Sequence, residues 1–122
     1  MSSSTQPIDP ERFTDEWIAA WNNHDLEAIL SHYDDAVVLR SPTAARIVPG
    51  SGGVISGKEA LRSYWTAALS ASPDLRFTAG ATYLGADTIA IAYTNQSGRH
   101  AIEMLRFEAG LVMETWIAHG LF

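Results

Sequence analysis

The sequence predicts an α+β fold in which helices pack on one side of a curved antiparallel β-sheet. In the N-terminal half, apolar residues recur at the spacing of amphipathic helices. From Leu75 onward the apolar period changes to two, as in strands that bury one face. Three short glycine-bearing turns separate these strands, at residues 85–87, 96–98 and 108–110. If each is a three-residue hairpin loop, odd-numbered residues share one face throughout the sheet.

The length of 122 residues fits one domain, predicted over residues 9–122 after a disordered tail at residues 1–8. The chain has 8 Lys and Arg against 14 Asp and Glu, so its formal net charge is −6. We expect no nucleic-acid partner, because a nucleic-acid groove needs clustered basic residues. No apolar stretch approaches the roughly 20 residues of a membrane span, so no membrane partner is expected either. Cysteine is absent and the N-terminus lacks the pattern of a signal peptide, which favours a cytoplasmic protein.

Two helices are predicted at the N-terminal end. Asp9 is placed to cap the first helix, with Pro10 at its first position. Its apolar stripe consists of Phe13, Trp17, Ala20 and Trp21. Residues 22–24 end this helix, and Asp25 can cap a second, shorter one. The apolar face of that helix holds Leu26, Ile29, Leu30 and Tyr33.

The middle of the chain predicts one strand, one loop and one helix. Residues 37–39 form a short strand that ends near Ser41 and Pro42, and the glycine-rich residues 43–57 are interpreted as a loop. Ser56 and Glu59 fit the capping-box pattern at the start of the next helix. The apolar stripe of that helix consists of Leu61, Tyr64, Trp65, Ala68 and Leu69.

Four strands are predicted, at residues 75–84, 88–95, 99–107 and 111–119. The turn lengths set Tyr83 opposite Ile89, Ile91 opposite Glu103, and Phe107 opposite Leu111. The inward face then collects Phe77, Tyr83, Ile89, Ile91, Tyr93, Leu105, Phe107, Leu111, Met113 and Ile117. The opposite face is half apolar, with Ile102, Met104, Val112 and Trp116 among charged residues. A half-apolar outer face predicts a homodimer that forms through the sheet.

Glu103 and His119 are the titratable residues predicted to lie on the inward face, and they are the candidate acid and base. Burial would raise the pKa of Glu103 and keep it protonated; alternatively, Glu103 is a structural carboxylate bonded to Thr115, directly across the pairing. His119 suits proton abstraction near neutral pH; alternatively, it is a solvated histidine at the rim. The register sets Arg99 opposite His119, where its charge would keep the imidazole neutral or help to bind an anionic substrate. Glu103 would then lie roughly 13 Å from Arg99, with room for a small ligand between the acid and the base.

The chain resembles the nuclear transport factor 2-like superfamily, and within it the SnoaL-like proteins, over about Phe13 to Gly120. The segments that carry the resemblance are Trp21–Ile29, Tyr33–Val37, Ser56–Arg62, Met104–Glu108 and Leu111–Val112. The resemblance implies a cystatin-like cone: a bent sheet wrapped around helices, with a pocket at the open end, often in a dimer. This superfamily hosts steroid isomerases, polyketide cyclases, dehydratases, epoxide hydrolases and non-catalytic binders, so the fold alone selects none of them.

Compared with the ketosteroid isomerases, one acid is kept and two residues differ. Ser41 stands where those enzymes have an aspartate base before a proline, and Trp17 stands where they have a tyrosine. Glu103 falls in the slot of their protonated acid. His119 lies on the last strand, which in polyketide cyclases supplies an acid or base. The resemblance also directs Trp17 and Tyr64 towards the cavity.

These observations favour a small-molecule pocket that needs no cofactor and no metal. His119 would abstract a proton next to a carbonyl group, and protonated Glu103 would stabilise the enolate, in an isomerase, cyclase or dehydratase. The expected substrate contacts are Trp17, Ser41, Tyr64, Asn95, Arg99 and Thr115. The alternatives are a non-catalytic ligand-binding or dimerisation module, and an epoxide hydrolase. The resemblance implies that an epoxide hydrolase needs acidic residues flanking an arginine, and Arg99 and Glu103 supply only part of that set.

Overall fold

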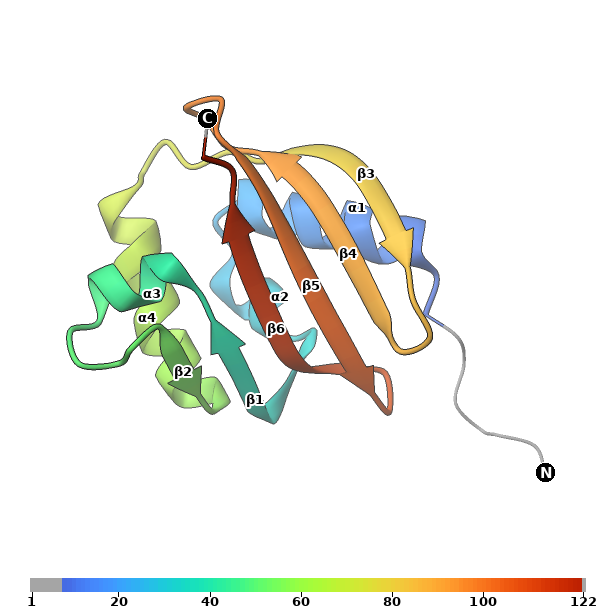
Figure 1. Ribbon diagram of the computed structural model, residues 1–122, viewed down its shortest axis with the longest axis horizontal. Coiled ribbons are helices and arrows are strands. Elements are labelled where there is room, and N and C mark those ends of the chain that lie inside the picture. The colour runs from blue at the N-terminus through green and yellow to red at the C-terminus, as the bar shows by residue number, and fades with distance from the viewer. Residues whose placement is uncertain (1–7, 122) are drawn as a thin grey trace.

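The computed structural model describes residues 8–121 and contains four α-helices and one six-stranded sheet. The strand order is β2-β1-β6-β5-β4-β3, and the sheet bends around the helices on one of its faces (Figure 1). Of the predicted N-terminal tail, all but Ile8 lies outside the described residues. None of the helices in the described part is long and apolar enough to cross a bilayer.

The two predicted N-terminal helices form: α1 spans Pro10–Asn22 and α2 spans Leu26–Leu30. Tyr33, predicted on the apolar face of the second helix, instead begins the first strand. The Asp9 carboxylate accepts hydrogen bonds from the backbone N–H groups of Glu11 and Arg12, which satisfies donors of the first turn. Asp25 caps α2 in the same way by accepting from the N–H of Ala28 at 3.1 Å. The predicted caps of both helices are therefore confirmed.

The predicted loop at residues 43–57 is wrong over much of its length. β1 spans Tyr33–Arg40, and a short helix, α3, follows directly over Pro42–Ile47. Ser41 caps this helix by accepting a hydrogen bond from the N–H of Thr43 at 3.1 Å. A short strand, β2, at Val54–Ser56 then pairs with β1.

The helix after this segment, α4, spans Lys58–Ala71, but its predicted capping box does not form. Ser56 belongs to β2, and the N-cap residue is Gly57, which makes no side-chain hydrogen bond. Gly57 has a φ of +92°, a conformation that glycine adopts without the steric cost of a side chain. Glu59 instead pairs with Arg62 one turn further along the helix.

The last four strands are β3 (Thr78–Leu84), β4 (Thr88–Thr94), β5 (His100–Glu108) and β6 (Leu111–His119). Between β4 and β5 the predicted register is confirmed, with Ile91 opposite Glu103. Between β3 and β4 it fails near the turn, where Tyr83 lies opposite Ala90, because a bulge between Ala79 and Thr82 shifts the strand by one residue. Tyr83 was predicted to point inward; it is 59% exposed instead.

A shorter turn and a second bulge change the pairing of β5 with β6. Glu108 lies opposite Leu111, so the turn contains only Ala109 and Gly110, the predicted three-residue loop is wrong, and Phe107 lies opposite Val112 rather than Leu111. Beyond the bulge Glu103 lies opposite Ile117 rather than Thr115. The residue that the bulge inserts is Met113. Because the turn is one residue shorter than predicted, Val112 is fully buried, although it was predicted on the outer face, and Leu111 and Met113 are only partly buried.

One strand pair in the sheet is parallel. β1 runs parallel to β6, with Leu39 opposite Thr115 and Arg40 opposite Trp116, whereas the other neighbouring strands are antiparallel. Because the two strands run in the same direction, the chain leaves β1 close to the end of β6. This places Ser41 and the start of α3 beside the end of β6, at the same end of the sheet as His119.

Candidate functional site

A cavity of about 400 Å³ lies between the inner face of the sheet and the helices α3 and α4. Its walls come from α1, β1, α3, α4, β4, β5 and β6, and from the segment between α4 and β3. The aromatic residues that line it are Trp21, Tyr64, Trp65, Phe77 and Tyr93. Its size and the cluster of aromatic side chains in its wall are typical of sites for small organic ligands.

Glu103 lines this cavity from β5 and is only 4% exposed. The hydroxyl of Thr115 donates a hydrogen bond to its Oε2 at 2.7 Å. Burial disfavours the carboxylate and raises the pKa of Glu103 from 4.5 to about 7, while the Thr115 hydrogen bond opposes this change. Glu103 is therefore present in both protonation states near neutral pH.

Three tyrosines, Tyr33, Tyr64 and Tyr93, are packed close enough to Glu103 for its charge to affect them. Burial raises the pKa of each, and the negative charge of Glu103 raises it further. All three therefore carry neutral hydroxyl groups at physiological pH. The hydroxyl of Tyr33 accepts a hydrogen bond from the Trp17 indole N–H at 3.0 Å, deep in the core.

His119 lines the cavity at the end of β6. Its Nε2 lies 3.1 Å from the Thr43 hydroxyl of α3, and its Nδ1 is buried without a hydrogen-bond partner among residues 8–121. Burial lowers the pKa of His119, and the charges of Arg99 and Arg46 lower it further. The imidazole is therefore neutral at pH 7.

The acid and the base are closer than the sequence predicts. Ala101, not Arg99, lies opposite His119, so the predicted pairing of Arg99 with His119 is wrong. Glu103 shares a sheet face with Ala101, which makes Glu103 and His119 diagonal neighbours on adjacent strands, about 7–8 Å apart along the backbone. A small ligand can contact both side chains at this separation.

Three of the predicted contact residues also line the cavity: Ser41, Tyr64 and Asn95. The Ser41 hydroxyl caps α3, and it hydrogen-bonds the Tyr64 side chain, which opposes the rise in the pKa of Tyr64. Asn95 uses its side-chain oxygen to accept hydrogen bonds from the backbone of Ser97 and Arg99 in the β4–β5 turn.

The other predicted contact residues, Trp17, Thr115 and Arg99, do not line the cavity. Trp17 is fully buried beneath it, among Trp21, Phe77 and Tyr93. Thr115 reaches the site only through its hydrogen bond to Glu103. The structure therefore does not bring Glu103 and Arg99 together in the cavity.

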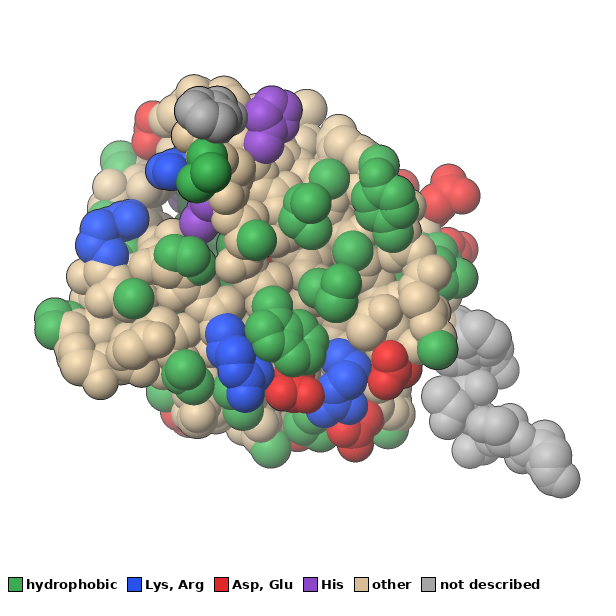
Figure 2. Space-filling model, viewed as in Figure 1, with side chains coloured by type: hydrophobic (Ala, Val, Ile, Leu, Met, Phe, Trp, Pro, Cys, Tyr) green, Lys and Arg blue, Asp and Glu red, His purple; other side chains and the backbone are tan. Residues whose placement is uncertain are grey.

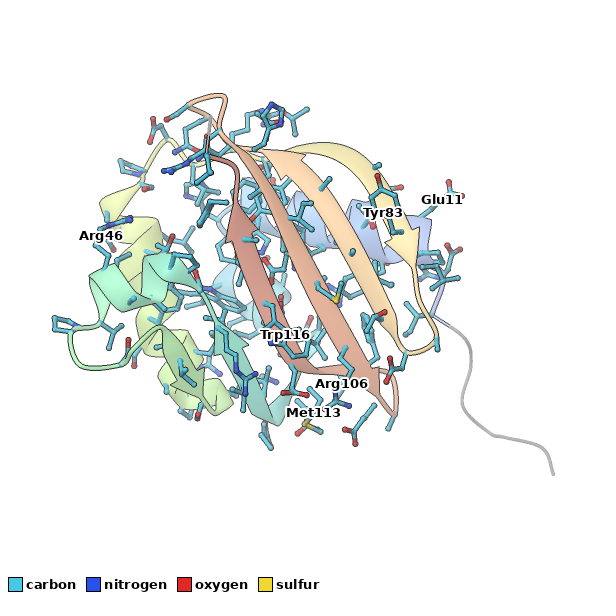
Figure 3. All side chains as sticks on the ribbon, viewed as in Figure 1. Glu11, Arg46, Tyr83, Arg106, Met113 and Trp116 are labelled. Atoms are coloured by element: carbon cyan, nitrogen blue, oxygen red, sulfur yellow. The ribbon has the colours of Figure 1, made fainter. Side chains whose placement is uncertain are left out.

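Two polar lining residues, Thr43 and Arg46, were missed because they belong to α3, which was predicted as loop. Thr43 contacts His119, and Arg46 lies at the edge of the molecule where α3 borders the cavity (Figure 3). The signal that could have found them is the Ser41-Pro42 pair, which matches the helix start at Asp9-Pro10. Among residues 8–121, no three His, Asp or Glu side chains cluster as ligands for a metal ion.

Solved structures of known proteins share this fold. A SnoaL-like protein of unknown function from Burkholderia thailandensis is 39% identical, covering 94% of this chain and 99% of that one, with a TM-score of 0.88. IdmH from Streptomyces antibioticus, described as a candidate polyketide cyclase, is 20% identical over 92% of each chain, with a TM-score of 0.75. TerC, co-crystallised with polyporic acid, is 14% identical over 91% of each chain, with a TM-score of 0.74.

No curated protein matches the chain in sequence. The likeness to IdmH and TerC shows a shared fold, because their identities are low. Residues 14–115, most of the chain, match the SnoaL-like domain. With the 39% identity to the Burkholderia protein, this match shows that the chain belongs to the SnoaL-like family.

Proposed function

We propose that the chain binds a ring-containing apolar molecule in this cavity and catalyses proton transfer next to a carbonyl group, without a cofactor. The observation that carries the proposal is the position of Glu103, a buried acid with a pKa of about 7 on the wall of an aromatic cavity. Titratable groups with strongly changed pKa values, placed in a cavity, are typical of catalytic sites. The reaction would be an isomerisation, a dehydration or an aldol-type cyclisation.

Glu103 would act as the hydrogen-bond donor. In its protonated form the carboxyl group can donate to a carbonyl oxygen of the ligand, and this hydrogen bond strengthens as negative charge develops on that oxygen. Thr115 leaves this donor available, because it uses its own proton to bond Oε2. No other side chain of residues 8–121 forms a hydrogen bond with the Glu103 carboxyl group, which is therefore available to the ligand.

His119 would act as the base. A neutral imidazole has one N–H and one free lone pair. If Nε2–H donates to the Thr43 hydroxyl, the lone pair that accepts the proton lies on Nδ1, which is buried in this structure and would meet the ligand after the imidazole turns toward the cavity. The proton moves from the carbon next to the carbonyl to Nδ1, the electron pair of the C–H bond forms the enolate, and the imidazolium returns the proton to a carbon of the same molecule.

The cavity wall supports a ring-containing ligand. Flat aromatic side chains from α1, α4 and β4 surround the space beside Glu103, and such side chains orient ring systems by edge and face contacts. TerC, which has the same fold, was crystallised with the small molecule polyporic acid. This agrees with small-molecule binding as the role of the cavity.

The proposal is tested with 2-tetralone, a bicyclic ketone with acidic protons next to its carbonyl group. In D₂O, the purified protein should accelerate exchange of these protons for deuterium, measured by ¹H NMR. Glu103→Gln and His119→Gln should each slow the catalysed exchange by about 100-fold, within the range for a general acid or base. Arg76→Gln, which removes a charge outside the cavity, is the control and should leave the rate unchanged.

The outcomes separate the two functional classes. Exchange that is lost in both variants supports the catalytic proposal. If 2-tetralone binds in the cavity but the protein does not accelerate its exchange, the chain is a non-catalytic binder, the alternative that Ser41 favours by replacing an aspartate base. An equal rate in the wild-type protein and both variants would show that Glu103 and His119 do not carry the reaction.

We also propose that the outer face of the sheet forms a homodimer. Ile102 and Met104 on β5 are 48% and 43% exposed, and Tyr83 on β3 lies on the same side of the sheet as Trp116 (Figure 3). Figure 2 shows that apolar side chains are spread over this face. A self-complementary pairing of this face would remove those side chains from water.

A further inference from the structure

Arg46 is a positive charge that the fold places at the cavity without a partner. It lies in the last turn of α3 and lines the cavity, and its side chain is exposed. Among residues 8–121 it forms no ion pair and no side-chain hydrogen bond, although the chain has more acidic than basic residues. The arginines that do pair with carboxylates are Arg12, Arg40, Arg62 and Arg106.

The position of Arg46 is set by the local structure rather than by a flexible loop. Ser41 begins α3 with its capping hydrogen bond, and the Ser41 backbone N–H donates to the carbonyl of Gly53 at 2.8 Å. Thr43, on the same helix, contacts His119 on β6. These contacts fix the backbone of α3 beside the cavity, and with it the position from which the Arg46 side chain extends.

The entrance is positively charged, whereas the cavity's single acidic residue is deep. Arg46 is close enough to lower the pKa values of both His119 and Tyr64 through its charge, and Arg99 also acts on His119. Glu103 is the only acidic residue among those that line the cavity, and it is buried far more deeply than Arg46. Figure 2 shows a hollow bordered by basic and histidine side chains at the edge of the sheet, and Figure 3 places Arg46 on that side.

We propose that Arg46 binds a carboxylate group on the ligand of this cavity. This inference rests on the proposed function, because it assigns a charged group to the ring-containing molecule proposed above. The ring would lie among the aromatic side chains, and the carboxylate would point outward to the guanidinium, whose fork of N–H donors matches two carboxylate oxygens. The reverse orientation would bury an anion beside Glu103, where burial and like charge both oppose it.

The inference is tested with two probes that share the naphthalene ring and differ in charge and by one methyl group: 2-naphthoate and its neutral methyl ester. Their affinities are measured by calorimetry or by quenching of tryptophan fluorescence, for the wild-type protein and for Arg46→Gln. The carboxylate should bind Arg46→Gln about threefold to tenfold more weakly than wild type, between the values for an exposed ion pair and a buried charged hydrogen bond. The ester should bind both proteins equally, and high salt should weaken only the carboxylate.

Two further variants separate a specific contact from a general charge effect. Arg76→Gln removes the same charge from an exposed arginine that does not line the cavity, and it should change neither affinity. Arg46→Lys keeps the charge but loses the planar fork, and it should recover part of the carboxylate affinity. Circular dichroism checks that each variant is folded, which we expect because the Arg46 side chain makes no hydrogen bond.

Each outcome supports or overturns the inference. A loss of carboxylate affinity that is confined to Arg46→Gln supports it. Suppose that the ester and the carboxylate both bind. If Arg46→Gln then changes carboxylate affinity by less than about twofold, or if Arg76→Gln weakens carboxylate binding as much as Arg46→Gln does, the proposed contact between Arg46 and the carboxylate is wrong, and the proposed function is unaffected. If neither probe binds the wild-type protein at millimolar concentration, the proposal that the cavity binds ring-containing molecules is overturned, and the proposed role of Arg46 is overturned with it.

Discussion

The Glu103 carboxyl group experiences two opposing influences. Burial in the cavity wall favours its neutral form, and the Thr115 hydrogen bond favours its ionised form. Burial is the larger effect, so the pKa rises to about 7. Such a group donates a hydrogen bond when protonated and loses that ability as the pH rises, so both stability and ligand binding should depend on its titration.

Glu103→Gln should change how stability depends on pH. In the unfolded chain Glu103 ionises near its ordinary value of 4.5, whereas in the folded protein it ionises near 7. Its contribution to the free energy of unfolding is therefore complete below pH 4.5 and is lost as the pH rises to about 7 and above, by about 3 kcal/mol at most. Urea unfolding at a series of pH values should show this loss in the wild-type protein and not in Glu103→Gln. Parallel curves for the two proteins would contradict the assigned pKa.

Thr115→Val should raise the pKa of Glu103 further, because it removes the hydrogen bond that favours the carboxylate. The loss of stability between pH 4 and pH 9 should then be larger than in the wild-type protein, by about 1 kcal/mol. Thr115→Ser keeps the hydroxyl group and is the matched control. Urea unfolding of both variants at the two pH values gives the comparison. If the free energy of unfolding of Thr115→Val changes between pH 4 and pH 9 by the same amount as in the wild-type protein, this hydrogen bond does not affect the titration of Glu103.

At the residue scale, the sequence predicts the acid and the base because they depend on simple periodicity. Glu103 interrupts an apolar alternation in a strand that has no bulge between it and β4, so counting in twos places it correctly. His119 follows from the same alternation along β6 beyond its bulge. Arg99 was misplaced because the β5–β6 register is shifted by two residues. Trp17, which the resemblance directs to the cavity, instead packs in the core against Tyr33.

At the scale of elements, α3 and β2 decide the shape of the cavity entrance. Gly53 connects them: it has a φ of +84°, and a Cβ built on it would lie 2.9 Å from the carbonyl oxygen of Ser41. This close approach accompanies the hydrogen bond from the Ser41 N–H to the Gly53 carbonyl. The start of α3, and with it Thr43 and Arg46, therefore depends on a glycine at this position.

Gly53→Ala should destabilise the protein by about 2–3 kcal/mol, because it combines a strained positive φ with a steric clash against backbone. Gly52→Ala is the matched control: its φ is +64°, but an added Cβ meets no atom within 4 Å. That variant should cost only the conformational strain, about 1 kcal/mol. Urea unfolding measures both costs, and equal values would contradict the close approach of Gly53 to Ser41.

The sequence predicts the long elements better than the short ones. α1, α4 and the strands from β4 to β6 each contain several helical turns or several apolar alternations, so the spacing of their apolar residues is recognisable in the sequence. α3 is six residues long and lies next to four glycines, and the composition of the segment conceals the helix start at Ser41. The bulges in β3 and β6 have no sequence signal that we recognise; the first explains the misplacement of Tyr83, whereas Val112 was misplaced because the β5–β6 turn has two residues instead of three.

On the scale of the whole molecule, the sheet separates two surfaces with different roles. The inner face and the helices enclose the cavity, and the outer face presents exposed apolar side chains. The outer face also carries an ionic network in which Arg106 and Arg40 pair with Glu114, and Arg40 lies over the Trp116 ring at 5.7 Å. The fold class and the orientation of the helices were predictable, because the sheet has a buried face that amphipathic helices must cover.

The double substitution Ile102→Lys with Met104→Lys should convert a sheet-mediated dimer into a monomer. It places two charges where the proposed interface would bury apolar side chains, and like charges would face each other across a twofold axis. Leu84→Lys is the control, because Leu84 is 66% exposed but lies opposite Ile89 and therefore belongs to the other face of the sheet, and it should leave association unchanged. Analytical ultracentrifugation measures the mass, and a wild-type monomer at micromolar concentration would contradict the proposed dimer.

The most direct test of the account is a pH titration of the Glu103 side chain, followed by ¹³C NMR of its carboxyl carbon, with and without 2-tetralone. The midpoint should lie near 7 in the free protein. With the ketone bound the midpoint should be higher, because the protonated acid then donates a hydrogen bond to the ligand. A midpoint near 4.5 that the ketone does not move would show that Glu103 is an ordinary carboxylate and would contradict the proposed chemistry of the cavity.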